Sequence, residues 1–335
     1  MNQPGRVIID NHGRPIEYMR LAVTDRCNLR CFYCMPEEGI KYLPKKALLT
    51  YEEMERLVDI TSKMGVSKIR ITGGEPFVRK DLIDFLGKLR ENERIKKINI
   101  TTNGVLTKQY LPRLHELDIK DINLSIDTLD RARFHHITRR DELPKVMDTL
   151  YAMLDMGFRV KINAVIMEGK NTEDILELAA FTKEHPVEIR FIEEMPFNGE
   201  GANYPKLTWN FKKIYTELES QYPDITRLTA EPASTAVRYK IPGHAGSLGI
   251  IAAFSRTFCG SCNRIRLTAQ GTLKTCLYDD GVLDLKALMR SGADDSAVEA
   301  ALLKAFKSRP RDGFEAEKNR TTLKNVSESM STIGG

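Results

Sequence analysis

Apolar and polar residues follow a repeating pattern over the first two thirds of the chain. Short β-branched runs alternate with longer stretches whose apolar residues recur at helical spacing. A capping box at Thr50 and Glu53 opens the first of these helices, and Gly65 ends it. The other expected helices are 80–91, 107–117, 143–156, 172–184 and 208–219, and the expected strands are 18–24, 67–72, 97–101, 121–126, 159–165 and 187–192.

Strands that alternate with helices predict a parallel sheet, and such short apolar strands are expected to be buried on both faces. Six strand–helix units, rather than eight, predict an α/β fold with a partial (β/α)6 TIM-like barrel. The alternation stops after residue 222, so we expect a smaller C-terminal α+β domain that covers the open side. The predicted domains are 1–225 and 226–335; the second contains β-like runs at 237–241 and 248–252 and helices near 283–290 and 294–307.

Polar and glycine-rich segments follow several of the expected strands. Functional groups of such folds gather where parallel strands end at their carboxyl side. These segments are therefore expected to line one mouth of the barrel. They are the cysteine loop 27–34, the run 73–76, the run 101–104, Ser125 and the run 193–195.

Composition narrows the possible partners and compartment. Of the 335 residues, 41% are hydrophobic, and the net charge of +5 is too small to indicate a nucleic-acid partner, although a local basic cluster could still bind a nucleotide. The N-terminus has no signal-peptide pattern, and no apolar run reaches the roughly 18 residues of a membrane span. A cytoplasmic protein that does not bind membranes is predicted.

The six cysteines form two triplets, which suit metal ligands better than disulfides. The first is C-x3-C-x2-C, at Cys27, Cys31 and Cys34. A four-iron cluster needs one ligand for each iron, so three thiolates leave one iron open to a substrate. A structural zinc loop is the alternative, but zinc requires four ligands, and no fourth Cys or His follows at motif spacing.

The second triplet, C-x2-C-x13-C, consists of Cys259, Cys262 and Cys276. It is also one ligand short for structural zinc. Arg264 and Arg266 follow it immediately, and guanidinium groups bind phosphates through bidentate, charge-assisted hydrogen bonds. A solvated arginine pair is the alternative interpretation.

The first triplet resembles the signature of the radical S-adenosylmethionine superfamily, in which an aromatic residue precedes the third cysteine, as Tyr33 does here. The run Gly73-Gly74-Glu75-Pro76 resembles the glycine motif of that superfamily, although a glycine pair alone is typical of a tight turn. The resemblance implies that the open iron chelates S-adenosylmethionine, which is cleaved to a 5′-deoxyadenosyl radical. It implies cofactor contacts at Tyr33, Gly74, Ser125 and Met195; Met195 taken alone would be a core residue.

Both triplets together, with Gly-Gly-Glu-Pro, C-x2-C-x-Arg-x-Arg and a terminal Gly334-Gly335, resemble the GTP 3′,8-cyclase family over essentially the whole chain. The resemblance implies two [4Fe-4S] clusters on the six cysteines. It implies conversion of GTP to (8S)-3′,8-cyclo-7,8-dihydroguanosine 5′-triphosphate, the first step of molybdenum cofactor biosynthesis, with guanine on the open iron of the second cluster. The implied GTP contacts are Arg20, Arg70, Thr101, Lys161, Arg264, Ile265 (through its backbone) and Arg266; the implied catalytic residues are Arg264, Arg266 and Arg190.

The same resemblance implies a homodimer, a reducing electron donor and a downstream cyclic pyranopterin monophosphate synthase. It also implies that the diglycine tail reaches the active site, where a frayed terminus is the alternative. The segment 308–313 matches the family pattern only loosely, and we expect this to affect the packing of the C-terminal helices alone. Two other functions stay open: a twin-cluster radical enzyme that modifies a peptide, and a non-enzymatic zinc or iron–sulfur protein.

Overall fold

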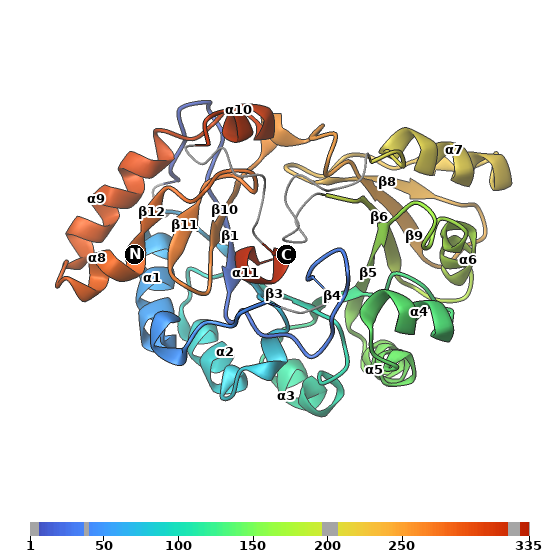
Figure 1. Ribbon diagram of the computed structural model, residues 1–335, viewed down its shortest axis with the longest axis horizontal. Helices are drawn as coiled ribbons and strands as arrows, with labels where there is room; N and C mark the ends of the chain where they lie inside the picture. Colours follow the sequence, from blue (N-terminus) through green and yellow to red (C-terminus); the bar gives the residue numbers. More distant parts are fainter. Residues whose placement is uncertain (1–6, 37–39, 196–206, 321–328, 335) are drawn as a thin grey trace.

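The computed structural model describes residues 7–36, 40–195, 207–320 and 329–334. Its described strands form a 12-stranded sheet in the order β12-β11-β10-β1-β2-β3-β4-β5-β6-β9-β8-β7, and most of the helices lie along its outer face (Figure 1). The six predicted strand–helix units are present, with one additional helix after the fourth strand. They are β1 (Tyr18–Ala22) and α1 (Tyr51–Lys63), β2 (Lys68–Thr72) and α2 (Leu82–Glu91), β3 (Lys97–Thr102) and α3 (Leu111–Glu116), β4 (Asp121–Ser125) with α4 (Arg131–Thr138) and α5 (Leu143–Asp155), β5 (Arg159–Ile166) and α6 (Asp174–Phe181), and β6 (Glu188–Glu193) and α7 (Phe211–Gln221).

The C-terminal third also extends the sheet itself. Its strand β9 pairs in parallel with β6, and its strand β10 pairs in parallel with β1. The partial barrel is therefore confirmed, and the pairings among the described strands do not close it. The division into domains at residue 225 stays a prediction. The C-terminal elements are β7 (Thr226–Arg227), β8 (Ala236–Lys240), β9 (Ser247–Ile251), β10 (Arg264–Leu267), β11 (Thr272–Lys274), β12 (Leu283–Asp284), α8 (Leu285–Arg290), α9 (Asp295–Phe306), α10 (Gly313–Lys318) and α11 (Met330–Ile333).

The strands β1 to β4 are largely buried on both faces, as expected, but only one of the two faces is apolar. In β1, Met19 and Leu21 are buried against the core, whereas Tyr18 and Arg20 line a cavity inside the barrel. The same alternation recurs in β2 to β6, because side chains of a strand point to opposite faces at a period of two. The helices bury the outer face, where each large apolar side chain contributes about 1.5–3 kcal/mol. The inner face carries the polar residues.

The start of α1 agrees with the sequence pattern that predicted it. The predicted capping box is present: Glu53 N donates to Thr50 Oγ1 at 3.2 Å, and Thr50 N donates to Glu53 Oε2 at 2.8 Å. Before β1, the described residues form one isolated antiparallel bridge, between Ile9 and Pro15.

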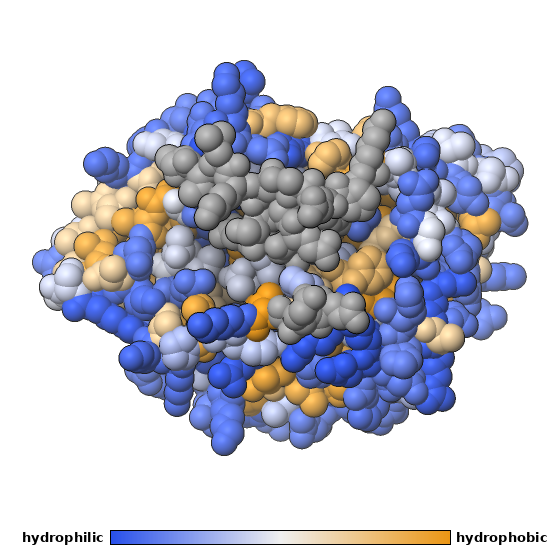
Figure 2. Space-filling view, viewed as in Figure 1, coloured by the Kyte–Doolittle hydropathy of each residue, from blue (hydrophilic) through white to orange (hydrophobic). Residues whose placement is uncertain are grey.

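Within the described part of the chain, no helix is both long and apolar enough to span a bilayer. On the face drawn in Figure 2, much of the rim is hydrophilic, whereas apolar side chains gather over α8 and α9.

Candidate active site

A cavity of about 480 Å³ lies inside the barrel. Inward-facing residues along the whole length of the strands line it, from Tyr18 at the start of β1 to the loops after the carboxyl ends. Both cysteine triplets line this one cavity. No three or more His, Cys, Asp or Glu side chains of the described residues are arranged to hold a single metal ion. Convergence on one ion is not required of cluster ligands, because each thiolate binds a different iron.

The first cysteine loop follows β1 and is held by backbone hydrogen bonds and by two arginines. Arg139 Nη1 donates to Arg30 O at 3.0 Å, and Arg30 Nη1 donates to Cys27 O at 2.6 Å. Arg30 N donates to Thr138 O at 2.9 Å, and Phe32 N donates to Ile137 O at 3.2 Å. Asn103 Nδ2 lies 3.7 Å from Cys27 Sγ, as a weak donor to the sulfur.

The environment of the first triplet opposes ionisation of its thiols. Burial raises the pKa of Cys27 to about 12 and that of Cys34 to about 11, and it also raises the pKa of Cys31. Neighbouring thiols raise the pKa of Cys27 and Cys31 further, so the sulfurs lie within electrostatic range of one another. Buried thiolates in such a place need cationic partners such as iron.

Gly73 and Gly74 join the end of β2 to this loop. Gly74 N donates to Thr24 O at 2.9 Å, and Glu75 N donates to Arg26 O at 2.8 Å. A Cβ on Gly74 would lie 2.3 Å from Arg26 O, which no side chain tolerates. The glycine pair is thus required by the approach of two backbones, whatever ligand it also contacts.

Two buried carboxyl groups support the same region. Glu75 accepts hydrogen bonds from Asn103 N at 2.7 Å and from Thr102 Oγ1 at 2.8 Å, and burial raises its pKa to about 7. Asp127 accepts from Tyr33 Oη at 2.9 Å, and burial raises its pKa to about 6. The hydroxyl group of Tyr33 is therefore anchored to Asp127, in the loop that follows β4.

The second cysteine loop is surrounded by arginine. Arg264 Nη1 and Arg309 Nη2 each lie 3.9 Å from Cys262 Sγ. Burial raises the pKa of Cys262, but the charge and the backbone N–H of Arg264, together with the charge of Arg309, outweigh it and lower the pKa below its ordinary value. Burial raises the pKa of Cys259, and it raises that of Cys276 to about 11.

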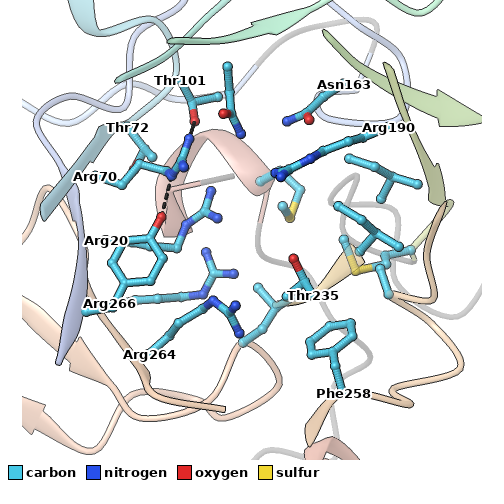
Figure 3. Close-up of a pocket in the computed structure, with 18 of the residues that line it drawn as sticks. Arg20, Arg70, Thr72, Thr101, Asn163, Arg190, Thr235, Phe258, Arg264 and Arg266 are labelled. Carbon is cyan, nitrogen blue, oxygen red and sulfur yellow. Dashed lines mark hydrogen bonds between the residues drawn. The ribbon is translucent and has the colours of Figure 1, made fainter. Parts of the chain in front are cut away.

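Three arginines stand side by side on adjacent strands. In the strand register, Arg20 of β1 is paired with Arg266 of β10 on one side and with Arg70 of β2 on the other. Neighbouring strands are about 4.8 Å apart, so these like charges repel unless an anion lies among them. In Figure 3, the guanidinium groups of Arg20, Arg70, Arg264 and Arg266 extend into the same space.

The electrostatics of this cluster fit a polyanionic ligand. Burial lowers the pKa of Arg20, and the nearby charge of Arg266 lowers it further. Burial also lowers the pKa of Arg266. The buried atoms Asn99 Oδ1, Asn163 Oδ1 and Thr72 Oγ1, which belong to cavity-lining residues, have no hydrogen-bond partner within the part of the chain described. A polar ligand in the cavity would satisfy such atoms.

Comparison with known proteins identifies the family. The chain is 38% identical over 328 residues to the GTP 3′,8-cyclase of Thermodesulfovibrio yellowstonii, which covers 97% of this chain and 99% of that protein. The chain belongs to the GTP 3′,8-cyclase family. The Radical SAM superfamily profile matches residues 21–182, and the Molybdenum Cofactor Synthesis C profile matches residues 187–314.

Longer family members contain this chain as one part. It is 43% identical over 292 residues to molybdenum cofactor biosynthesis protein 1 of Bos taurus, which covers 87% of this chain but 46% of that protein. The chain thus spans about half the length of that relative.

A solved structure agrees with the fold. The crystal structure of Streptococcus suis SuiB matches 93% of this chain and 70% of its own, with a TM-score of 0.60 at 16% identity. This likeness bears on the fold alone. Radical SAM membership assigns S-adenosylmethionine and iron–sulfur clusters as the cofactors, and two buried thiol triplets on one cavity fit such clusters.

The structure brings all but one of the residues predicted from family motifs to this cavity. The exception is Ile265, whose buried side chain does not line the cavity, and its backbone contact to GTP stays a prediction. Two of the predicted basic residues already have an acidic neighbour: Arg190 Nε donates to Glu188, and Lys161 Nζ lies 3.6 Å from the same carboxylate. Met195 lines the cavity and also packs against the cluster around Ile333, so both of its interpretations hold geometrically.

The C-terminal tail enters the barrel. Figure 1 draws α11 inside the ring of strands, and Ser329 Oγ donates to the backbone oxygen of Cys34. Arg266 Nη1 donates to Gly334 O at 2.7 Å. A Cβ on Gly334 would lie 2.7 Å from Thr72 Oγ1, which explains a glycine there. Gly335 lies outside the described residues.

Sequence reasoning missed several residues of the site. Tyr18 accepts a hydrogen bond from Arg70 Nε at the floor of the cavity, and Asn163 lies beside Arg190 on the adjacent strand. Their signal was available: they occupy alternate positions in strands whose other residues are apolar. Arg309 was missed for a different reason, because its segment was expected to affect only helix packing.

Proposed function

We propose that this chain is a GTP 3′,8-cyclase that uses S-adenosylmethionine and two [4Fe-4S] clusters, held by Cys27, Cys31 and Cys34 and by Cys259, Cys262 and Cys276. The observation that carries the proposal is the meeting of both thiol triplets and a row of arginines in one cavity. The product would be (8S)-3′,8-cyclo-7,8-dihydroguanosine 5′-triphosphate. A substrate with several negative charges fits this row of arginines better than a neutral peptide does.

The chain's own residues would position the substrate. Arg20, Arg70 and Arg266 would bind the triphosphate through charge-assisted hydrogen bonds. Arg70 is already oriented for this role, because its Nη1 donates to Thr101 Oγ1 at 3.2 Å. Bonds of this kind fix the ribose and base relative to the cysteine loops, and such positioning supplies much of the catalytic effect in a two-substrate reaction.

Other residues would complete the site. Tyr33, Gly74, Ser125 and Met195 are proposed to contact S-adenosylmethionine, and Lys161, Thr101, Arg264 and the backbone of Ile265 to contact GTP. Glu188 orients Arg190 and restrains Lys161, so these cations reach the cavity at fixed positions. When bound, the first cluster supplies the electron that releases a 5′-deoxyadenosyl radical for abstraction of a hydrogen atom from the ribose.

The decisive test is anaerobic incubation with GTP, S-adenosylmethionine and dithionite. The wild type should form 5′-deoxyadenosine and a cyclised GTP. Cys259→Ser should still cleave S-adenosylmethionine but form no cyclised product, while Ser261→Ala, an exposed change in the same loop, should behave as wild type. Full cyclisation by Cys259→Ser would refute the role of the second cluster. Stoichiometric zinc without iron would refute the whole mechanism.

The physiological setting follows from the family resemblance. The protein would act in the cytoplasm as a homodimer, accept electrons from a reducing donor and pass its product to cyclic pyranopterin monophosphate synthase. Sedimentation of the protein and product transfer in a coupled assay test the dimer and the downstream partner separately.

A further inference from the structure

Two arginines from opposite ends of the chain share one buried carboxylate beside the second cysteine loop. Asp10 Oδ2 accepts from Arg14 Nε at 2.8 Å and from Arg309 Nη1 at 3.0 Å. The side chains of Asp10, Arg14 and Arg309 are 0%, 6% and 2% exposed, so water does not screen this triad. Buried charges are costly unless they are paired and fully hydrogen-bonded, which indicates that the triad has a specific task.

The hydrogen bonds of the triad reach the backbone at each of the three cysteines. Arg14 Nη1 donates to Cys259 O at 3.1 Å, and Arg309 Nη1 donates to Cys262 O at 3.3 Å. Arg309 Nη2 donates to the carbonyl oxygen of Thr275, the residue before Cys276, at 3.1 Å. The guanidinium group of Arg309 therefore joins the segments that carry Cys262 and Cys276, and Arg14 holds the backbone at Cys259.

The same guanidinium group also faces a sulfur. Arg309 Nη2 lies 3.9 Å from Cys262 Sγ and donates to Arg264 O at 2.9 Å. Two guanidinium groups and one carboxylate leave one net positive charge in the triad. Positive charge and hydrogen bonds near the sulfurs of a cluster favour its reduced form and so raise its potential.

We propose that Arg309, oriented by Asp10 and Arg14, is the positioning residue of the second cluster: it fixes the three cysteines and raises the reduction potential of the cluster they hold. This inference rests on the proposed second cluster and deepens it. The triad assigns a function to the segment 308–313, which motif reasoning had connected only with helix packing.

The test compares Arg309→Met with Arg311→Met, two residues away, whose side chain is 76% exposed. Each is made in the full chain with Cys27, Cys31 and Cys34 replaced by alanine, so that only the second cluster is measured. Arg309→Met should release iron to a chelator at least about tenfold faster and show a lower midpoint potential. Arg311→Met should leave both quantities unchanged.

A conservative variant separates charge from geometry. Arg309→Lys retains the charge but cannot bridge the carbonyl groups, so it should restore the potential but not the rate of iron release. Unchanged release and potential in Arg309→Met would overturn the proposal. If Arg309→Met does not fold, Asp10→Asn provides the test. This variant retains both guanidinium groups and removes the negative charge, so the reduction potential of the second cluster should rise. An unchanged potential would overturn the proposal.

The experiment also distinguishes this inference from the proposed function. About eight irons per wild-type chain are expected from two four-iron clusters. If the wild type binds about four, the assignment of the second cluster fails. If it binds about eight and Arg309→Met matches it in release and potential, only the role of Arg309 fails.

Discussion

Backbone hydrogen bonds and two half-buried arginines, Arg30 and Arg139, hold the first cysteine loop, whereas two buried arginines that share one carboxylate hold the second. The first loop rests on the carbonyl groups of residues 137 and 138 and on the close approach of Gly74. The second is held by Arg14 and Arg309, which reach it from the two ends of the chain. The thiols differ accordingly: all three pKa values are raised in the first loop, while that of Cys262 is lowered in the second.

This difference indicates a division of roles between shape and charge. A cluster that binds and cleaves S-adenosylmethionine needs a loop of fixed shape. A cluster beside a bound triphosphate lies next to the cationic groups that bind the phosphates, and these groups make the surroundings of the cluster positive. We therefore expect the first loop to be sensitive to added volume and the second to lost charge.

The largest effect should come from added volume at the first loop. In Gly74→Ala the new Cβ would meet Arg26 O at 2.3 Å, so the loop must move. Displacement of reacting groups by about 1 Å can reduce a rate by about 100-fold, and we expect at least that loss in 5′-deoxyadenosine formation. Gly87→Ala, where no atom lies within 4 Å of the new Cβ, is the matched control. A wild-type rate in Gly74→Ala would contradict the shape argument.

Removal of Arg266, which follows the second cysteine loop and lines the cavity, should weaken GTP binding. A hydrogen bond to a charged group contributes about 1.5–3 kcal/mol, so Arg266→Ala should raise the Kd for GTP about tenfold to a hundredfold. Equilibrium binding measurements give the Kd for GTP and the Kd for S-adenosylmethionine separately, and only the Kd for GTP should change. Arg131→Ala, a change at an exposed ion pair, serves as the control. An equal loss of affinity for both ligands would mean that the variant disturbs the whole barrel.

Tyr18 should make GTP binding depend on pH. Burial raises its pKa, but the charges of Arg70, Arg20 and Lys68 lower it to about 7. Above that pH the phenolate offsets part of the positive charge, so GTP should bind more weakly as pH rises through about 7. Bound phosphate should raise the pKa of Tyr18, and each unit of that increase corresponds to a change of about tenfold in the affinity for GTP.

The control for this prediction is Tyr18→Phe, which retains the ring and removes the titrating hydroxyl. Titration of the phosphate itself is common to both proteins. Tyr18→Phe should therefore not show the additional loss of GTP affinity above about pH 7. Identical pH profiles of GTP affinity in the two proteins would mean that Tyr18 does not cause this loss.

The smallest effect should come from a neutral donor at the first loop. Asn103 Nδ2 lies 3.7 Å from Cys27 Sγ. A neutral hydrogen bond contributes about 0.5–1.5 kcal/mol, less than a charged one. Asn103→Ala should therefore accelerate iron release from the first cluster only about two- to tenfold, less than Arg309→Met does at the second. A larger effect at Asn103 would reverse the proposed contrast between the loops.

Much of the site could be predicted because its signals are local. The cysteine spacings, the glycine run and the C-x2-C-x-Arg-x-Arg motif are local. They place all six cysteines, Gly73, Gly74, Arg264 and Arg266 on the cavity, whereas Glu75, Pro76 and Ile265 do not line it. The strand β10 was not predicted, because Arg264 and Arg266 suggested a polar motif rather than a strand. Helix α4 was not predicted, because its sequence RARFHHIT has few apolar residues at helical spacing.

By itself, the sequence determined the alternation of strands and helices, the two thiol triplets and the family. These follow from periodicity and spacing, which are properties of neighbouring residues. Only the tertiary structure decided that the arginines at positions 20, 70 and 266 are adjacent, because strand register joins residues far apart in the chain. It alone brought Asp10 and Arg309 together: a buried charge selects its partner by proximity in space, and no local pattern encodes that proximity.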